Sequence, residues 1–226
     1  MPATKITFTN ESGIELAGLL ETPDSTPEYY ALFAHCFTCS KDLKAAARIS
    51  RGLVNKGVAV LRFDFTGIGN SEGDFANTNF SSNLEDLVSA ADYLKQEFSA
   101  PKMLIGHSLG GAAVLAVAQT IPSVEAIVTI GAPATARHLE HLLAEFKDDI
   151  EANDKAAINL GGQTFTVKKQ FLQDLENHNT VEHIGELQQA LLIFHSPVDE
   201  VVSIDEAARI YQAARHPKSF ISLDKA

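Results

Sequence analysis

Short apolar runs alternate along the chain with longer segments in which apolar residues recur at helical spacing. The short runs are rich in aliphatic and aromatic residues and predict strands, whereas the longer segments predict helices. The predicted strands cover residues 5–10, 14–22, 29–36, 58–65, 102–108, 124–133, 190–197 and 219–224. The predicted helices cover residues 42–57, 83–98, 109–121 and 204–215. We expect the first two strands to pair antiparallel and the others to form right-handed βαβ units, which gives an α/β fold with a mostly parallel sheet and helices on both faces.

Local signals mark the ends of three predicted helices. Gly57 has the position of a residue that ends a helix. Ser82 with Glu85, and Ser203 with Glu206, have the spacing of a capping box, in which two side chains bind free N–H groups at a helix start.

Residues 134–187 interrupt this alternation and are too long for an ordinary connection. They contain two helical patterns, at 138–146 and 168–178, and a hairpin that turns at Gly161-Gly162. We therefore predict a core made of residues 1–133 and 188–226, with residues 134–187 inserted as a small cap. Four apolar cap residues either line a substrate pocket or pack within the cap: Phe146, Phe165, Phe171 and Leu172.

Composition narrows the class of protein. The 226 residues are 45% hydrophobic and 21% charged, as in an ordinary globular protein. The formal charge of −11 argues against nucleic acid and anionic membranes as partners. No apolar run has the length of a signal peptide or a membrane span. We expect a cytoplasmic enzyme or binding protein.

The stretch "IGHSLGG" carries the first sign of chemistry. It places Ser108 between Gly106 and Gly110, after a predicted strand and before a predicted helix. In that context the pattern G-x-S-x-G indicates a serine nucleophile on a tight turn, where the helix N-terminus stabilises negative charge.

With this stretch, the chain resembles the α/β-hydrolase family, and the resemblance extends over essentially its full length. "RFDFTGIGNSEG" resembles the family's segment after the fourth strand, and "LLIFHSPVDEVVS" resembles the segment that carries the acid of the catalytic triad. The resemblance implies that Asp199 is that acid. Asp64 is its rival, although its place in a turn-rich loop before the nucleophile favours a structural role.

The stretch "FAHCFTCS" occupies the place of the family's oxyanion loop. The resemblance puts His35 and Cys36 on the family's His-Gly pair and makes Phe37 one oxyanion donor, with Leu109 as the second. Cys36 departs from the usual glycine, which puts the loop geometry in question. His107 is expected to pack beside the turn, so that His35, Cys36 and His107 lie near the pocket.

Two alternatives to a hydrolase stay open. Cys36 and Cys39 form a Cys-x-x-Cys pair between a strand and a helix, as in thiol redox proteins. A hydrolase fold that binds a ligand without catalysis is the other alternative. His138 and His141 are three residues apart, yet no ligand cluster completes a metal site around them, and a solvated helix face is favoured. No metal and no organic cofactor is implied.

The resemblance also predicts where the general base lies. In the family a histidine follows the last strand, which here is "SFISLD", so we expect the base about two residues beyond Ala226. The chain is similar to the hydrolase half of proteins that continue into an OsmC-like domain. His35, or a histidine from another subunit, would be a substitute, and an apolar sheet flank would favour a homo-oligomer.

Taken together, these features predict a serine hydrolase that cleaves small carboxylic esters or thioesters. Ser108 would be the nucleophile, Asp199 the acid that orients a histidine, and Phe37 and Leu109 the oxyanion donors.

Overall fold

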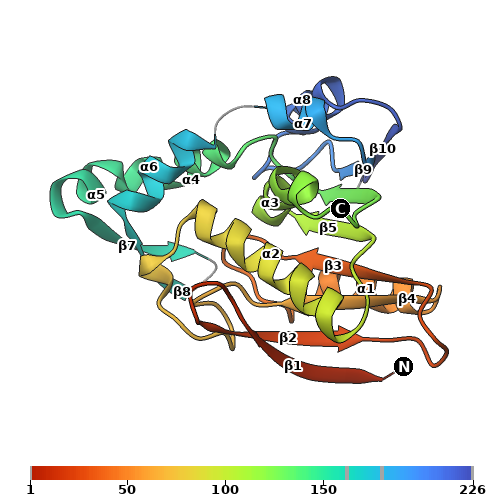
Figure 1. Cartoon of the computed structure of the whole chain (residues 1–226). Coiled ribbons are helices and arrows are strands. Elements are labelled where there is room, and N and C mark those ends of the chain that lie inside the picture. The colour runs from red at the N-terminus through yellow and green to blue at the C-terminus, as the bar shows by residue number, and fades with distance from the viewer. Residues whose placement is uncertain (1, 161–162, 179–180, 225–226) are drawn as a thin grey trace.

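The computed structural model describes residues 2–160, 163–178 and 181–224. Within these residues, eight strands form one sheet in the order β1-β2-β4-β3-β5-β6-β9-β10 (Figure 1). Their bounds are β1 (Ala3–Thr9), β2 (Glu15–Glu21), β3 (Tyr29–Ala34), β4 (Val58–Phe63), β5 (Met103–His107), β6 (Ala126–Ile130), β9 (Ala190–His195) and β10 (Lys218–Ser222). Strand β2 pairs antiparallel with β1 and β4, and every other pair in this sheet is parallel. The predicted α/β fold, with its antiparallel opening pair, is confirmed.

Helices cover both faces of the sheet because the inner strands are apolar on both sides. The helices between the strands are α1 (Lys44–Val54), α2 (Phe80–Glu97), α3 (Leu109–Val117) and α8 (Ile204–Ala213). On β3, Leu32 and Ala34 belong to the large core shared with α2, α3 and α8, whereas Ala31 and Phe33 belong to a smaller core under α1. This alternation follows from the two-residue period of a strand. The alternation therefore determines which helices cover each face of the sheet.

The capping boxes of two helices differ from the prediction. Helix α2 begins earlier than expected, and its capping box joins Asn79 to Ser82 rather than Ser82 to Glu85. At α8, Ser203 accepts a hydrogen bond from the Asp205 N–H as expected of a cap. Glu206 does not complete a box there, because its carboxylate accepts the N–H of Ala134 at 2.8 Å. A neighbouring local box thus replaced the predicted one at α2, and a contact with a distant residue replaced it at α8.

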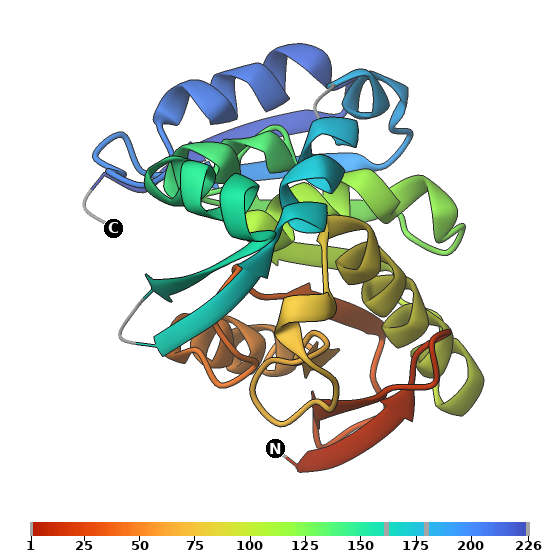
Figure 2. The same ribbon diagram turned by 90° about the vertical axis from the view of Figure 1, so that its left-hand side faces the viewer.

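The segment 134–187 lies beside the main sheet (Figures 1 and 2). It contains η3 (Ala136–His138), α4 (Leu139–Leu143), η4 (Ala144–Phe146), α5 (Lys147–Asn153), β7 (Lys155–Leu160), β8 (Gln163–Lys168), α6 (Lys169–Asn177) and α7 (Glu182–Glu186). Strands β7 and β8 pair antiparallel as a sheet of their own, as the hairpin prediction requires, while its turn at Gly161-Gly162 lies outside the described residues. Helix α7 packs against α3 and α8 of the core. The division into core and cap stays a prediction.

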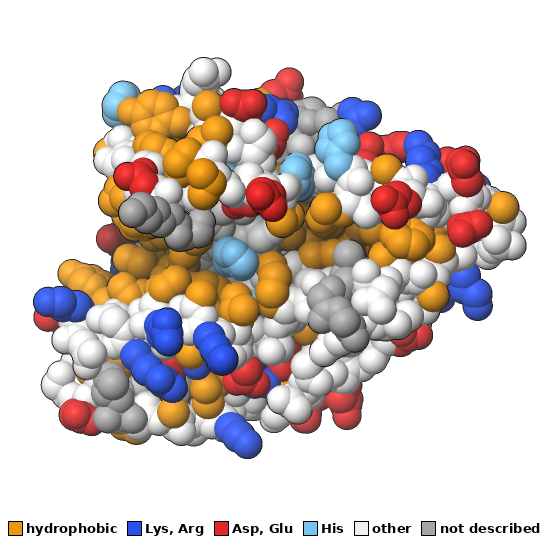
Figure 3. All heavy atoms as spheres, turned by 180° about the vertical axis from the view of Figure 1, so that it is seen from behind, with side chains coloured by type: hydrophobic (Ala, Val, Ile, Leu, Met, Phe, Trp, Pro, Cys, Tyr) orange, Lys and Arg blue, Asp and Glu red, His pale blue; other side chains and the backbone are white. Residues whose placement is uncertain are grey.

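The outer strand at one end of the sheet exposes apolar side chains. On β10, Phe220 and Ile221 are 42% and 43% exposed. Figure 3 shows the face opposite to that of Figure 1, where hydrophobic side chains line a hollow that crosses the molecule. Self-association through an apolar flank stays a prediction.

No helix in the described part of the chain is long and apolar enough to cross a bilayer.

Candidate active site

Ser108 lies on a strained turn between β5 and α3. Its φ of 52° and ψ of −124° make it one of two non-glycine residues with positive φ among those described. The Ser108 N–H donates to the Ile130 carbonyl at 2.9 Å, and the Ser108 carbonyl accepts the N–H of Gly111 at 2.8 Å. Such a conformation costs about 1–3 kcal/mol and persists only where surrounding contacts hold it. Strain of this kind is typical of residues with a functional role.

The two glycines of the motif allow the turn to form. A Cβ on Gly106 would lie 2.3 Å from the Gly110 carbonyl oxygen. A Cβ on Gly110 would lie 2.3 Å from the Ala34 oxygen and 2.4 Å from the His35 oxygen. Both positions bring backbone against backbone, which no side chain could accommodate. The spacing G-x-S-x-G is therefore a steric requirement of this turn.

The predicted oxyanion residues meet at one cavity. Leu109 is the first residue of α3, so its N–H has no partner inside the helix and lies at the positive end of the helix dipole. Phe37 reaches the same cavity from the loop after β3. The residues that line this cavity are His35, Cys36, Phe37, Phe65, Ile68, Phe75, Phe80, Asn83, Leu109, Gly110 and Ala113. Two segments about 70 residues apart are thus brought together as the sequence predicts.

Cys36 and Cys39 are joined by a disulfide. Their Cα atoms lie 5.2 Å apart, and the Cys39 N–H donates to the Cys36 carbonyl at 3.3 Å. The pair brackets Phe37, so the disulfide closes a small loop around a predicted oxyanion donor.

His35 has both ring nitrogens engaged. Nδ1 lies 2.7 Å from the Cys36 carbonyl, to which it donates, and Nε2 accepts the N–H of Phe65 at 3.4 Å. Burial lowers the pKa of His35, against smaller opposing effects of the Cys36 carbonyl and the Asp64 charge. With its nitrogens occupied, His35 is poorly placed to act as the substitute base.

His107 precedes Ser108 and carries a buried Nδ1 that has no hydrogen-bond partner in the described part of the chain. Burial lowers the pKa of His107, and the charge of Asp199 acts in the opposite direction. Burial thus favours the neutral form of the imidazole beside the Ser108 turn.

Asp199 follows β9, as Ser108 follows β5, and both strands end at the same edge of the parallel sheet. Its Oδ1 accepts the N–H groups of Val201 and Val202, each at 2.9 Å. Its Oδ2 lies 3.7 Å from His195 Nε2. Gly131 directly follows the intervening strand β6 with φ of 52°, and a Cβ there would lie 3.3 Å from Oδ2. Gly131 keeps the space beside this carboxylate open, and no sequence motif indicated it.

Asp64 has a different environment. Its side chain is fully buried and lies 2.6 Å from Lys41 Nζ. The carboxylate also accepts the backbone N–H groups of Lys41 at 2.6 Å and Asn70 at 2.9 Å. These partners occupy the carboxylate and tie the turn-rich loop to the loop after β3. A structural role for Asp64 fits this geometry.

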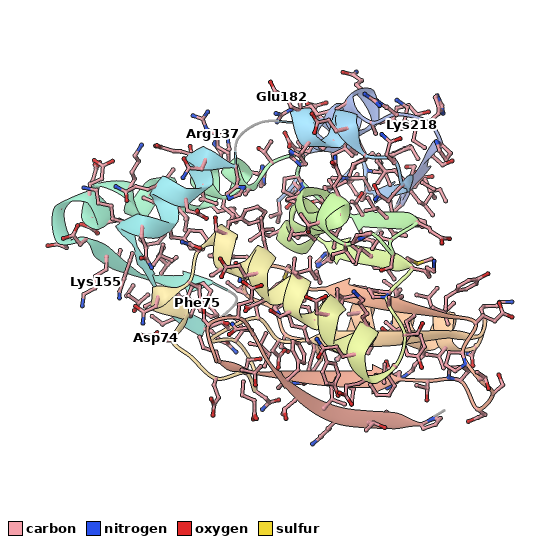
Figure 4. All side chains as sticks on the ribbon, in the orientation of Figure 1. Asp74, Phe75, Arg137, Lys155, Glu182 and Lys218 are labelled. Atoms are coloured by element: carbon pink, nitrogen blue, oxygen red, sulfur yellow. A yellow bond between two sulfur atoms is a disulfide. The ribbon has the colours of Figure 1, made fainter. Side chains whose placement is uncertain are left out.

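Aromatic rings connect the oxyanion loop to the segment 134–187. The Phe37 ring lies 5.2 Å from that of Phe171 and 5.4 Å from that of Phe75. Phe75, labelled in Figure 4, lies 4.9 Å from Phe165 on β8. Phe171 is 1% exposed, which favours packing over pocket lining for this residue. Leu172 lines a separate hollow with Glu140, His141 and other residues of α4 to α6.

Comparisons with known proteins identify the family. A family model described as serine aminopeptidase, S33, matches residues 41–150. The esterase domain of a Rhodothermus marinus protein is 48% identical, covers all of this chain and 89% of its own, and superposes with a TM-score of 0.80. The chain belongs to the α/β-hydrolase family.

Other members of the α/β-hydrolase family are more distant. Est1E of Butyrivibrio proteoclasticus, solved with ferulic acid bound, shares the fold at 20% identity and a TM-score of 0.82, over 96% of this chain and 88% of its own. The mitochondrial palmitoyl-protein thioesterase ABHD10 of Mus musculus is 26% identical over 75% of this chain. This α/β hydrolase spans 58% of the length of that mouse protein and 62% of its Rattus norvegicus counterpart.

Proposed function

We propose that this α/β hydrolase is a serine hydrolase that cleaves small carboxylic esters or thioesters through an acyl-enzyme. The observation that carries the proposal is the strained Ser108 turn at the N-terminus of α3, beside a cavity lined by Phe37 and Leu109. The esterase and thioesterase names of relatives support the same reaction class.

The geometry supports a two-step reaction. Ser108 Oγ attacks the carbonyl carbon while a histidine takes its proton, and the carbonyl oxygen becomes negatively charged. The N–H groups of Phe37 and Leu109, with the dipole of α3, stabilise that charge. The alcohol or thiol then leaves with a proton from the histidine, and a water molecule hydrolyses the acyl-serine by the reverse sequence.

Asp199 has the role of orienting that histidine. Its Oδ1 is fixed by two backbone N–H groups, so the position of the carboxylate is set before a histidine reaches it. The family resemblance implies that the base is a histidine placed between Asp199 and Ser108.

An irreversible probe tests Ser108 directly. A fluorophosphonate forms a stable bond to the serine oxygen, so labelling accumulates even when each reaction is slow. We expect intact-mass analysis to show one adduct, mapped to Ser108 by peptide sequencing and lost in Ser108→Ala.

Ser123→Ala is the matched control. Ser123 precedes β6 and donates to the Pro101 carbonyl at 2.8 Å, so it lies at the opposite edge of the sheet. This variant should label like the wild type. An adduct at another serine, or equal labelling of Ser108→Ala, would contradict the proposal.

A further inference from the structure

Three metal-binding side chains meet beside the Ser108 turn. The sulfur atoms of Cys36 and Cys39 and a ring nitrogen of His107 all lie within 4.8 Å of one another. We refer to these three residues as the cysteine–histidine cluster. The cysteines belong to the loop after β3, and the histidine ends the neighbouring strand β5. The parallel pairing of these two strands brings the three side chains to one edge of the sheet.

Two features of the cluster indicate a ligand. His107 Nδ1 is buried and has no hydrogen-bond partner in residues 2–160, 163–178 and 181–224. Leaving such an atom unpaired costs about 1–3 kcal/mol, so a partner that used it would be favoured. The spacing Cys-x-x-Cys is also that of half of a zinc site, where a short turn presents two sulfurs to one ion.

We propose that the cysteine–histidine cluster binds one Zn²⁺ ion when the Cys36–Cys39 disulfide is reduced. A dithiol such as dithiothreitol supplies the two electrons and two protons, and becomes a cyclic disulfide while the two cysteines become thiols. The ion then replaces the two thiol protons, which are released to solvent, and takes the imidazole as a third ligand.

The dimensions of the cluster suit this ion. Zinc bonds of about 2.3 Å to sulfur and about 2.0–2.1 Å to nitrogen place tetrahedral ligands about 3.5–3.8 Å apart. The three donors already lie within 4.8 Å, and breaking the disulfide frees the sulfurs to separate around an ion. Two thiolates and an imidazole are ligands that select Zn²⁺ over Mg²⁺ or Ca²⁺. A water molecule would complete the coordination.

The bound ion would act on the site next to it. Cys36 directly precedes Phe37, and His107 lies two residues before Leu109. Binding of the ion by these side chains would therefore shift both segments that carry the proposed oxyanion donors. This consequence rests on the proposed function, and it predicts that Zn²⁺ inhibits ester hydrolysis by the reduced protein only. Disulfide formation would release the ion and restore the rate.

Metal binding is measured without reference to catalysis. The chain is reduced with dithiothreitol, freed of it under nitrogen, and titrated with Co²⁺ as a spectroscopic substitute and with Zn²⁺ against a chromophoric chelator. We expect one ion per chain and the thiolate-to-cobalt charge-transfer absorption. The air-oxidised wild type should show neither, and it controls for other metal-binding groups without any mutation.

Three variants assign the ligands. Cys36→Ser/Cys39→Ser should abolish the charge-transfer absorption, and His107→Gln should weaken binding by at least the roughly 10–100-fold that loss of an outer-shell partner costs. His141→Gln, at an exposed histidine of α4, should bind like the wild type. Equal binding by reduced and oxidised protein, or by wild type and His107→Gln, would overturn the inference.

Measurements of ester hydrolysis beside Zn²⁺ binding distinguish a failure of this inference from a failure of the proposed function. Zn²⁺ binding with no ester hydrolysis in any form would uphold the site and refute the hydrolase. Ester hydrolysis that Zn²⁺ leaves unchanged in the reduced wild type, with no metal bound, would uphold the hydrolase and refute the site.

Discussion

The buried carboxylate of Asp64 is held by charge and by backbone groups at the same time. Lys41 Nζ and two N–H groups surround it, and both partners of the ion pair are almost fully buried, with side chains 7% and 0% exposed. Gly69 completes this environment, since a Cβ there would lie 2.3 Å from Asp64 Oδ2. A carboxylate with this many partners stabilises two loops near the site rather than taking part in proton transfer.

Removal of the charge of Asp64 should therefore lower the free energy of unfolding of the protein. Asp64→Asn leaves the buried Lys41 with only the exposed Asp42, 3.6 Å away, as a counter-charge, and we expect a loss of up to about 3–5 kcal/mol of unfolding free energy. Urea denaturation at neutral pH, followed by circular dichroism, measures this loss.

An exposed ion pair provides the comparison. Lys102 and Glu125 are 43% and 68% exposed and lie 2.5 Å apart. Glu125→Gln should change the unfolding free energy by no more than about 1 kcal/mol. If the two variants lost similar free energies of unfolding, the Lys41–Asp64 pair would not be what stabilises the two loops near the site.

At the scale of elements, a side chain of α6 caps the start of α2. Asp174 accepts the Ser81 N–H at 2.7 Å and the Ser81 hydroxyl at 2.6 Å. His178 Nε2 lies 2.9 Å from the same hydroxyl. The carboxylate thus lies at the positive end of the α2 dipole, where a negative charge is favourable. This contact holds the segment 134–187 against the core.

Loss of this cap should loosen α6. Asp174→Ala leaves the Ser81 N–H without its partner, and we expect a loss of about 1–2 kcal/mol, in the range of other helix caps. Hydrogen–deuterium exchange should rise at residues 80–84 and 169–177 while β5 and β6 stay protected. Asp148→Ala, at an exposed position in the first turn of α5, is the control. Equal exchange in the two variants would contradict the role of Asp174.

The strands and the Ser108 turn could be predicted because their signals are local. Apolar runs predict the strands, and the motif G-x-S-x-G is a short pattern that can be recognised without its contacts, although Gly110 is required by the distant carbonyls of Ala34 and His35. Asp174 and Gly131 could not be found in this way, because the residues that they contact are distant in sequence. Asp174 binds Ser81, 93 residues away, and Gly131 lies beside Asp199, in the loop after β9. The capping box predicted at Ser82 and Glu85 was wrong for a different reason: α2 begins three residues earlier, so a local box of Asn79 and Ser82 takes its place.

At the scale of the whole molecule, the proposed catalysis requires that the two loops at the sheet edge and a histidine come together. Ser108 and Asp199 follow strands β5 and β9, which β6 separates, so a histidine side chain has to reach between them. Among the described residues, His35 has both ring nitrogens engaged, and His195 Nε2 lies 2.7 Å from the Val202 carbonyl. Neither imidazole is free to take the Ser108 proton, so residues 1–226 should hydrolyse esters slowly, at the level that binding and the oxyanion hole provide.

Imidazole added to the solution tests this arrangement. If the gap between Ser108 and Asp199 is open, free imidazole should enter it and raise the hydrolysis of p-nitrophenyl esters by residues 1–226 saturably, recovering part of the roughly 10²–10⁴-fold that a positioned base contributes. Ser108→Ala should show only the rate of imidazole in buffer, and a bulky imidazole derivative should rescue less than imidazole itself. A panel of graded acyl chains, run at saturating imidazole, then reports the shape of the pocket. A linear response identical in wild type and Ser108→Ala would show that no such gap exists beside the serine.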